Sequence, residues 1–545
     1  MKSPKTVSRS YLRLVNNTKI YVALLCALWL MCNSAFAQRP PTPNFLPSGI
    51  SLGPIERVSL APDGSELNAP AFQPTLSGDG RFLLYTSLAS NILPGMPDPP
   101  VPADPAAVNN CNSPVLYQWY VLDRQTRQVE RVSVNNQGQP AASRPLPSGC
   151  SLFSRPQGNI SRDGRYVFYN TIADNLGATD TNQGNDSYRF DRQTKQVQKL
   201  YSAPSGRRLT YVTYSADGEV FIVLCDGAGL ATVSLCVRDM RTNTIAPILA
   251  IDGQPTIGED FANLRFGLNF DGSVVVYLSS SPRLVPGGGN GQIQAVRWNR
   301  QTGERRIISI RQDGALSDGV DSSNFGQGPH FFAVNDDARV VAFPIRDGGA
   351  ANVGYNSVGA VWREATGKME SVSHNTEIEP RVSFGFPSMS GDGDLLIFFS
   401  VFGGFDQFNN FLGSRQIWLR RNRGEGPAGR LIRNLQSYHP SLGQGEDLRA
   451  ENHPAFLSWG MHGFNARRGV ISGDGKTVAF TSYAPDLVVN DLLPINELTQ
   501  QGVDIFVARV IDTEKIIVVE APIGNNWLWG ALALLVLLVG IRFRD

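Results

Sequence analysis

The chain repeats a short phrase, Ser-x-Asp-Gly, at seven places, and this repetition constrains its fold more than any other feature. Each copy is followed by a run rich in β-branched and aromatic residues, for example residues 81–85 and 165–169. Asp-Gly between two such runs strongly predicts a β-hairpin, because glycine tolerates the positive φ of a type I′ turn. We expect a distorted turn in the fifth copy, where Ala338 replaces the glycine. The copies begin at Ser77, Ser161, Ser215, Asn269, Asn335, Ser390 and Ser472.

A second phrase recurs in phase with the first, after it in the same repeat. It reads Asp-Arg-Gln-Thr at residues 123–126 and 191–194, and related forms occur at 299–302 and 363–366. We expect it to join a third strand to a fourth. Four strands per unit, repeated every 54 to 84 residues, are typical of propeller blades, which close into a ring and so limit exposed edges. The sequence predicts an all-β, seven-bladed β-propeller of four-stranded antiparallel blades over residues 55–520.

Length and composition agree with this fold class. A chain of 545 residues is too long for one ordinary core, so it is multidomain or built from repeats. Its 54 glycines and 35 prolines favour many turns over long helices. Lys and Arg number 49 against 48 Asp and Glu, so no basic excess exists to neutralise phosphates. We therefore expect no nucleic-acid partner.

The fourth strand of the last blade has two candidates. Residues 55–60 resemble a fourth strand and would close the ring from the N-terminal side. Residues 515–519 are an equally good candidate from the C-terminal side. Either one of these strands is peripheral, or the closing blade has an extra strand.

The N-terminus predicts export. Lysines and arginines precede the apolar run 20–31, and the small residues of Ala35-Phe36-Ala37 stand where signal peptidase cuts. The run is too short for a membrane span, which needs about 20 residues. We predict a signal peptide over residues 1–37, followed by a Pro-rich linker over 38–54.

The C-terminus predicts membrane contact through a transmembrane helix. An apolar run covers residues 527–541, and Arg542 and Arg544 follow it. Positive charge on that side predicts a cytoplasmic end, with the propeller on the periplasmic or cell-surface side of the inner membrane. The tail, residues 521–545, also resembles the C-terminal sorting tails of Gram-negative bacteria, although Pro522 is followed by Ile523 rather than by Thr-Leu. That resemblance implies removal of the tail by a sorting enzyme.

Four cysteines remain after the predicted cleavage, an even number in an exported chain, which favours two disulfides. We prefer the pairs Cys111 with Cys150 and Cys225 with Cys236. The second pair frames Asp226-Gly227, a turn that would bring its flanking strands within bridging distance. The alternative of four buried thiols stays open.

The two repeated phrases resemble the PD40 (WD40-like) repeat of TolB-type β-propellers. Residues 85–95, YTSLASNILPG, look like an exported subgroup of that superfamily. The resemblance covers residues 55–520 and implies the fold more than the function, because the superfamily includes scaffolds, lyases and peptidase regulatory domains. TolB carries an α/β domain before its propeller, whereas only residues 38–54 precede the first strand here. Its partners are therefore not carried over.

Few residues suggest chemistry, and we predict no catalytic residues and no cofactor. Gly49-Ile50-Ser51-Leu52-Gly53 matches the nucleophile elbow of hydrolases, but no buried strand precedes it and no helix follows, so we interpret it as a chance match. The stretch 180–186 offers Asp180, Asn182 and Asp186 as oxygen ligands for Ca²⁺. The competing interpretation is a polar turn between two strands of one blade.

These observations favour a non-enzymatic propeller that presents loops to an envelope protein or a glycan. The alternative is a propeller enzyme, a polysaccharide lyase or hydrolase acting on an envelope or extracellular glycan. A lyase needs a convergent set of His, Arg and metal ligands near the axis, and the five histidines are scattered along the chain.

Overall fold

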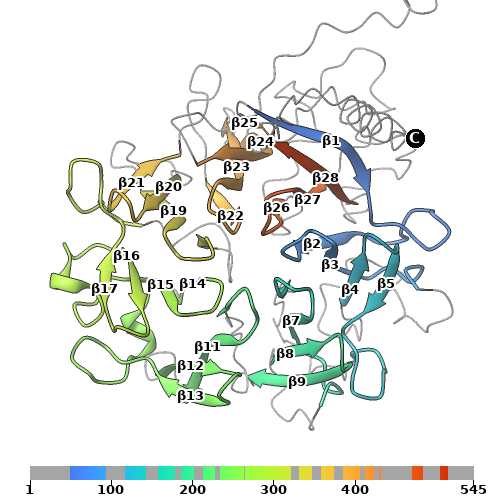
Figure 1. The fold of residues 1–545 in the computed structure, drawn as a ribbon, viewed down its shortest axis with the longest axis horizontal. Helices are drawn as coiled ribbons and strands as arrows, with labels where there is room; N and C mark the ends of the chain where they lie inside the picture. The colour runs from blue at the N-terminus through green and yellow to red at the C-terminus, as the bar shows by residue number, and fades with distance from the viewer. Residues whose placement is uncertain are drawn as a thin grey trace, which may run out of the picture. The chain divides into compact units, whose positions relative to one another are not determined.

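The computed structural model describes one propeller within the unit Leu46–Asp545, the second of two compact units; the first is Met1–Phe45. Seven antiparallel sheets of four strands each are arranged around a common axis (Figure 1). The predicted all-β class, the blade count and the four strands per blade are confirmed. The described residues are 49–93, 117–142, 157–177, 186–201, 213–226, 234–262, 264–320, 331–346, 357–372, 384–405, 411–422, 429–430, 469–482 and 504–512.

Each blade runs from an inner first strand to an outer fourth strand. The first strands are β2 (Ala71–Leu76), β6 (Gly158–Ile160), β10 (Thr213–Tyr214), β14 (Phe266–Leu268), β18 (Ala333–Val334), β22 (Gly385–Met389) and β26 (Gly469–Ile471). The second strands are β3 (Phe82–Ser87), β7 (Tyr166–Thr171), β11 (Val220–Asp226), β15 (Val274–Ser279), β19 (Val340–Arg346), β23 (Leu395–Phe405) and β27 (Thr477–Ser482). The third strands are β4 (Gln118–Asp123), β8 (Asp186–Asp191), β12 (Ser234–Asp239), β16 (Gln294–Asn299), β20 (Ser357–Arg363), β24 (Phe411–Arg421) and β28 (Asp504–Asp512). The fourth strands are β5 (Gln128–Arg131), β9 (Gln196–Tyr201), β13 (Thr244–Pro247), β17 (Arg305–Ile307), β21 (Lys368–Ser371), β25 (Gly429–Arg430) and β1 (Ile50–Arg57). Two short 3-10 turns, η3 (Gly258–Asp260) and η4 (Pro286–Gly288), lie in connections of the fourth blade.

The N-terminal strand β1 closes the ring. It pairs antiparallel with β28, from Ile50 opposite Asp512 to Arg57 opposite Phe506, with a register shift between Leu52 and Ile55. The last blade therefore takes three strands from the C-terminal part of the chain and one from the N-terminal part. Residues 50–54, expected as linker, are part of β1, and residues 515–519 lie outside the described residues.

The core lies in the seven spaces between neighbouring blades. Each space holds one cluster of buried apolar side chains drawn from two adjacent sheets. Successive residues of one strand serve opposite spaces: Leu83 and Tyr85 pack toward the last blade, whereas Leu84 packs toward the second. Both faces of the inner strands are thus buried, which explains why these strands read as nearly continuous apolar runs.

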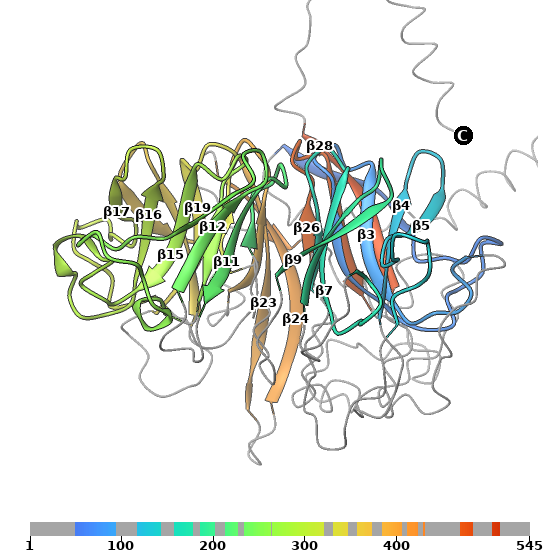
Figure 2. The same cartoon turned by 90° about the horizontal axis from the view of Figure 1, so that it is seen from below.

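The antiparallel blades give the propeller two different faces. The Ser-x-Asp-Gly turns join the first strands to the second, and the turns between third and fourth strands lie at the same end; we call this end the motif face. The opposite end, the loop face, carries the connections from second to third strands and from blade to blade. The hairpin of β23 and β24 extends beyond the other strands at the loop face (Figure 2).

The predicted membrane-directed segments lie outside the described part of the chain. These are the signal peptide, residues 1–37, and the C-terminal tail, residues 521–545. Within the ranges that the structure describes, no helix has the length and apolar character needed to cross a membrane.

Candidate functional site at the propeller axis

The Ser-x-Asp-Gly turn has one hydrogen-bond pattern throughout. In the first copy the Ser77 hydroxyl donates to the Asp79 carboxylate at 2.6 Å and accepts the Phe82 backbone N–H at 2.9 Å. The same carboxylate accepts the Arg81 N–H at 2.9 Å. The other six copies repeat these side-chain bonds, two of them with asparagine in place of serine. Both side chains therefore shape the turn.

The predicted type I′ turn is wrong, and so is the predicted distortion at Ala338. The motif glycines have positive φ, 69° at Gly80, but the aspartates before them do not, so a single left-handed residue ends each turn. Ala338 adopts the same conformation with φ of 56°, and its N–H donates to the Asn335 carbonyl at 3.0 Å. The bonds of the Asn335 and Asp337 side chains hold the turn in shape despite the alanine.

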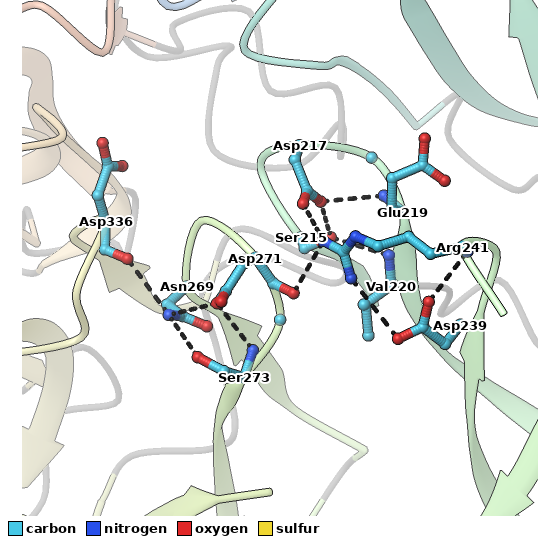
Figure 3. A network of polar contacts seen from close by, with 12 residues as sticks. Ser215, Asp217, Glu219, Val220, Asp239, Arg241, Asn269, Asp271, Ser273 and Asp336 are labelled. Carbon is cyan, nitrogen blue, oxygen red and sulfur yellow. Dashed lines mark hydrogen bonds and ion pairs between the residues drawn. The ribbon is translucent and has the colours of Figure 1, made fainter. Parts of the chain in front are cut away.

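Backbone hydrogen bonds join the seven turns into a closed ring around the axis. Each bond runs from the second or third residue of one turn to the second residue of a neighbouring turn, and the last turn bonds back to the first. Figure 3 shows the neighbouring turns of β10–β11 and β14–β15, where the Asn269 amide also reaches the Asp336 carbonyl at 3.2 Å. The seven bonds are Gly78 N–H to Arg162 O, Arg162 N–H to Ala216 O, Asp217 N–H to Phe270 O, Phe270 N–H to Asp336 O, Asp336 N–H to Gly391 O, Gly391 N–H to Gly473 O, and Asp474 N–H to Gly78 O, at 2.7 to 3.2 Å.

The second repeated phrase fastens three of the turns to their own blades. Arg124, Arg192 and Arg300 donate from their guanidinium groups to the carbonyls of the motif glycines in the same blades, at 2.6 to 2.7 Å. In the sixth blade the Asn422 amide makes the equivalent bond, at 2.9 Å. The two phrases recur in phase because they contact each other at the motif face.

Two of these turns also carry a bidentate ion pair. Arg165 holds the Asp191 carboxylate through two hydrogen bonds, at 3.1 and 2.7 Å, and Arg81 holds Asp123 in the same way. The paired guanidinium lowers the pKa of Asp191 to about 2, and that of Asp123 is lowered as well. These bonds make the turns rigid supports for whatever lies at the axis.

The second residue of each motif lies nearest the axis, and there the copies differ. Four of them are glycine or alanine, and the others are Arg162, Phe270 and Asp336. The Arg162 guanidinium makes an ion pair with Asp336 and lies 5.9 Å from the centre of the Phe270 ring. Phe270 remains 38% exposed, so part of its aromatic face is open to solvent. We define these three residues as the axial cluster.

Three glycines give the Arg162 side chain its space. A Cβ atom added at Gly473 would lie 1.4 Å from Arg162 Nη1, and one at Gly78 would lie 2.1 Å from Cδ. At Gly391 it would meet both the Asp336 carboxylate, at 2.4 Å, and Arg162 Nη1, at 2.8 Å. The guanidinium therefore extends across the axis over bare backbone. Any residue larger than glycine at these three positions would occupy the space of the Arg162 side chain.

Burial and like charges act on the axial carboxylate. Loss of solvent raises the pKa of Asp336, the Arg162 charge opposes that rise, and the neighbouring Asp337 and Asp392 add to it. The axial cluster thus combines a carboxylate that needs a positive neighbour with a partly exposed aromatic face. Such a combination recognises a cation or an amphipathic group.

Of the predicted calcium ligands, the structure describes only Asp186, which does not belong to the axial cluster. Asp180 and Asn182 lie outside the described residues, and Asp186 begins β8 at the loop face. Its buried carboxylate accepts a hydrogen bond from the Lys199 ammonium at 2.5 Å, so a calcium ion there would compete with a fixed positive charge. Over the residues that the structure describes, no group of three or more His, Cys, Asp or Glu side chains is placed to hold a metal.

The cysteines are only partly described. Cys236 is buried in β12 and is disulfide-bonded, and its partner is outside the described side chains. Cys225 belongs to β11, where the register shifts between Leu224 and Asp226. Cys111 and Cys150 are outside the described ranges. The two predicted pairings stay predictions.

The nucleophile-elbow match is part of a strand. Ser51 lies in β1 opposite Ile511, so it does not stand on the turn from strand to helix that such a nucleophile requires. All five histidines of the sequence fall outside the described residues.

A small pocket between the second and third blades is too small to compete with the axial cluster as a binding site. Its volume of about 10 Å³ is enough for one water molecule. It is lined by Gln157, Phe168, Tyr169, Asn170, Ser187, Tyr188, Leu200 and Tyr214.

Sequence reasoning missed the axial cluster and a third repeated turn. Turns of similar pattern join consecutive blades at residues 61–65, 135–139, 250–254 and 311–315, each with a left-handed glycine. Aligning the seven motif copies would have revealed the axial cluster, because their second position holds one arginine, one aspartate and one phenylalanine among small residues. In a propeller, equivalent positions of the repeat face a common axis.

No protein-family model matches the sequence, and no curated protein matches it either. Similar folds occur in solved structures. An oligogalacturonate lyase from Vibrio parahaemolyticus aligns at 13% identity and a TM-score of 0.42, over 84% of this chain and 96% of the lyase. The β-propeller domain of the Trilobed protease from Pyrococcus furiosus aligns at 10% identity and a TM-score of 0.39, over 76% and 90%.

TolB proteins are also among these structural neighbours. TolB from Acinetobacter baumannii aligns at 15% identity and a TM-score of 0.30, over 55% of this chain. The match spans about half of that TolB, 53% of its length. At these TM-scores the neighbours say nothing about the function of this chain. The count of seven blades comes from the hydrogen-bonded sheets of this chain alone.

Proposed function

We propose that this chain is an exported, envelope-associated β-propeller that binds a protein or glycan partner without catalysing a reaction. The observation that supports this most directly is the exposed Phe270 beside the ion pair of Arg162 and Asp336. Exposed aromatic and arginine side chains are the residue types that contribute most to binding interfaces.

The ring of turns makes this site suitable for binding. Seven backbone hydrogen bonds fix the second residue of every motif relative to its neighbours. The axial side chains therefore project from backbone that needs little further ordering when a partner arrives. Such preorganisation increases affinity, because less conformational entropy is lost on binding.

Export and membrane attachment belong to the same proposal. The predicted signal peptide, residues 1–37, would deliver the propeller outside the inner membrane, and the tail, residues 521–545, would hold it there until a sorting enzyme acts. Deleting residues 527–545 should release a soluble propeller into the periplasmic fraction. Membrane association that survives deletion and a high-salt wash would contradict anchoring by the tail.

Crosslinking in intact envelopes tests the binding role. We expect the wild-type protein to capture a defined partner and Phe270→Ala to lose most of that capture. Ile245→Ala is the matched control, because Ile245 is 58% exposed on the outer strand β13, away from the axis. Equal capture by Phe270→Ala would exclude the axial cluster as the binding site. Turnover of an envelope polysaccharide by purified protein would overturn the non-enzymatic assignment.

A further inference from the structure

We propose that the axial cluster is a binding site for a guanidinium or ammonium group, which Arg162 fills in the free protein and a basic side chain of the partner fills in the complex. The inference deepens the proposed binding function by naming the chemistry of the partner. It starts from the position of Arg162, whose guanidinium makes an ion pair with Asp336 and lies 5.9 Å from the centre of the Phe270 ring.

The surroundings of Arg162 have the parts of a cation site. The Asp336 carboxylate supplies the opposite charge, and the Phe270 ring supplies the negative face of an aromatic quadrupole. Gly391 and Gly473 provide a floor that is free of side chains, on which a flat guanidinium fits closely. Because the ring of turns holds all of these groups in place, the site keeps its shape when its occupant changes.

The sign of the ligand follows from the charges that remain without Arg162. Asp336 then has no positive partner in the axial cluster, and Asp337 and Asp392 act on it as further negative charges. An anionic ligand would be repelled, whereas a cation would restore the balance. The Phe270 ring binds a weakly hydrated, delocalised cation better than a strongly hydrated metal ion. The site therefore favours arginine over a metal ion.

Arg162 can leave the site at low cost. Its side chain is 24% exposed and that of Asp336 is 42% exposed, so water screens their attraction. The Arg162 backbone stays fixed by its hydrogen bonds to the turns on either side, and only the side chain must rotate. A partner that inserts its own arginine would therefore exchange one ion pair for another while adding its surrounding contacts.

Chemical rescue provides the test. Arg162→Ala removes the part of the side chain that N-ethylguanidinium replaces, so this ion should raise the Tm of the full-length variant in detergent and saturate in the millimolar range, as expected for a very small ligand. Wild-type protein should show no saturable rise, because its site is filled. Urea has a similar shape without the charge and should stabilise neither protein.

The double variant Arg162→Ala/Asp336→Asn identifies the site. Its affinity for N-ethylguanidinium should be at least about tenfold lower, because the charged partner of the ligand is gone. Equal responses of the single and double variants would overturn the proposal, and so would a saturable response to urea. Loss of rescue with Phe270→Ala in the Arg162→Ala background would support the aromatic contribution.

A second measurement applies if Arg162→Ala does not fold. Binding of the capped peptide acetyl-Gly-Arg-Gly-amide to Arg162→Gln, which removes the charge that fills the site, is compared at low salt with binding to Arg162→Gln/Asp336→Asn, and the Asp336 substitution should weaken binding about tenfold or more. Equal binding would overturn the cation site. Partner capture that depends on Phe270 while both ligand tests fail would leave the binding function standing and remove only the cation assignment.

Discussion

The motif face and the loop face of the propeller differ in how strictly the sequence repeats. At the motif face, seven turns share one hydrogen-bond pattern and bond to each other around the axis. At the loop face, the connections from second to third strands vary widely, from residues 406–410 in the sixth blade to residues 88–117 in the first. The turns of the first face are therefore bonded to one another around the whole ring, whereas the connections of the second face differ in length from blade to blade.

Packing between blades explains this difference. The motif glycines sit against the blade before them: a Cβ at Gly272 would lie 2.5 Å from Val220 Cβ, and one at Gly80 would lie 2.5 Å from Thr477 Oγ1. Left-handed glycines in the loop-face connections, such as Gly253 and Gly138, have no atom within 4 Å of an added Cβ. A motif turn must satisfy both its own backbone and a neighbouring blade.

The largest expected effect comes from replacing a motif glycine. Gly272→Ala should lower the free energy of unfolding by about 3 kcal/mol, because strain at positive φ adds to a collision with the buried Val220. Gly253→Ala shares the positive φ but not the collision, so it should cost only about 1 kcal/mol. Urea unfolding of both variants measures the difference, and equal losses would show that the neighbouring blade does not constrain the turn.

Residues that repeat made the fold predictable. The spacing of Ser-x-Asp-Gly gave seven hairpins, and the second phrase gave the turns between third and fourth strands, which the structure confirms at β4–β5 and β8–β9. The closing strand could not be chosen, because pairing of β1 with β28 joins residues separated by almost the whole chain. Local patterns carry no information about such a distant partner.

Residues that do not repeat make the axial cluster, which is why sequence reasoning missed it. Arg162, Phe270 and Asp336 occupy the variable position of their motifs and come together only when the ring closes. The turn at Ala338 was misjudged for a related reason. Local preference disfavours alanine at positive φ, but the hydrogen bonds that the Asn335 and Asp337 side chains accept from the backbone N–H groups of Val340 and Arg339 override it.

The bidentate pair of Arg165 and Asp191 should give the next largest effect, and it depends on pH. Asp191→Asn should cost about 1 kcal/mol at neutral pH, a modest value because Arg165 is 33% exposed. The pKa of Asp191 is lowered from 3.8 to about 2, so its contribution is complete above about pH 4 and disappears as pH falls toward 2. Urea unfolding at pH 7 and pH 2 should show that most of the difference between variant and wild type is lost at the lower pH, where half of the native Asp191 is protonated. An undiminished difference at pH 2 would contradict the assigned pair.

A stabilising change is expected at the one motif turn that lacks glycine. Ala338→Gly should raise the free energy of unfolding by about 0.5 to 1 kcal/mol, because glycine adopts the φ of 56° without strain. Ala342→Gly in β19 is the matched control and should destabilise, since that alanine is buried in regular strand. If both substitutions destabilise, the buried methyl group of Ala338 contributes more than its backbone strain costs.

The smallest expected effect tests how asparagine differs from serine in the motif. Asn269 keeps the bonds that serine makes in other copies and adds one across to the next blade, from its amide to the Asp336 carbonyl at 3.2 Å. Asn269→Ser should remove this cross-blade bond, and with it the bond from the amide to the Ser273 hydroxyl within the turn, and cost about 0.5 kcal/mol, because the Asp336 carbonyl still accepts the Phe270 N–H. Asn335→Ser is the control, since the amide of Asn335 bonds within its own turn. Urea unfolding should show a larger loss for Asn269→Ser, and equal losses would mean that the backbone ring alone couples these two blades.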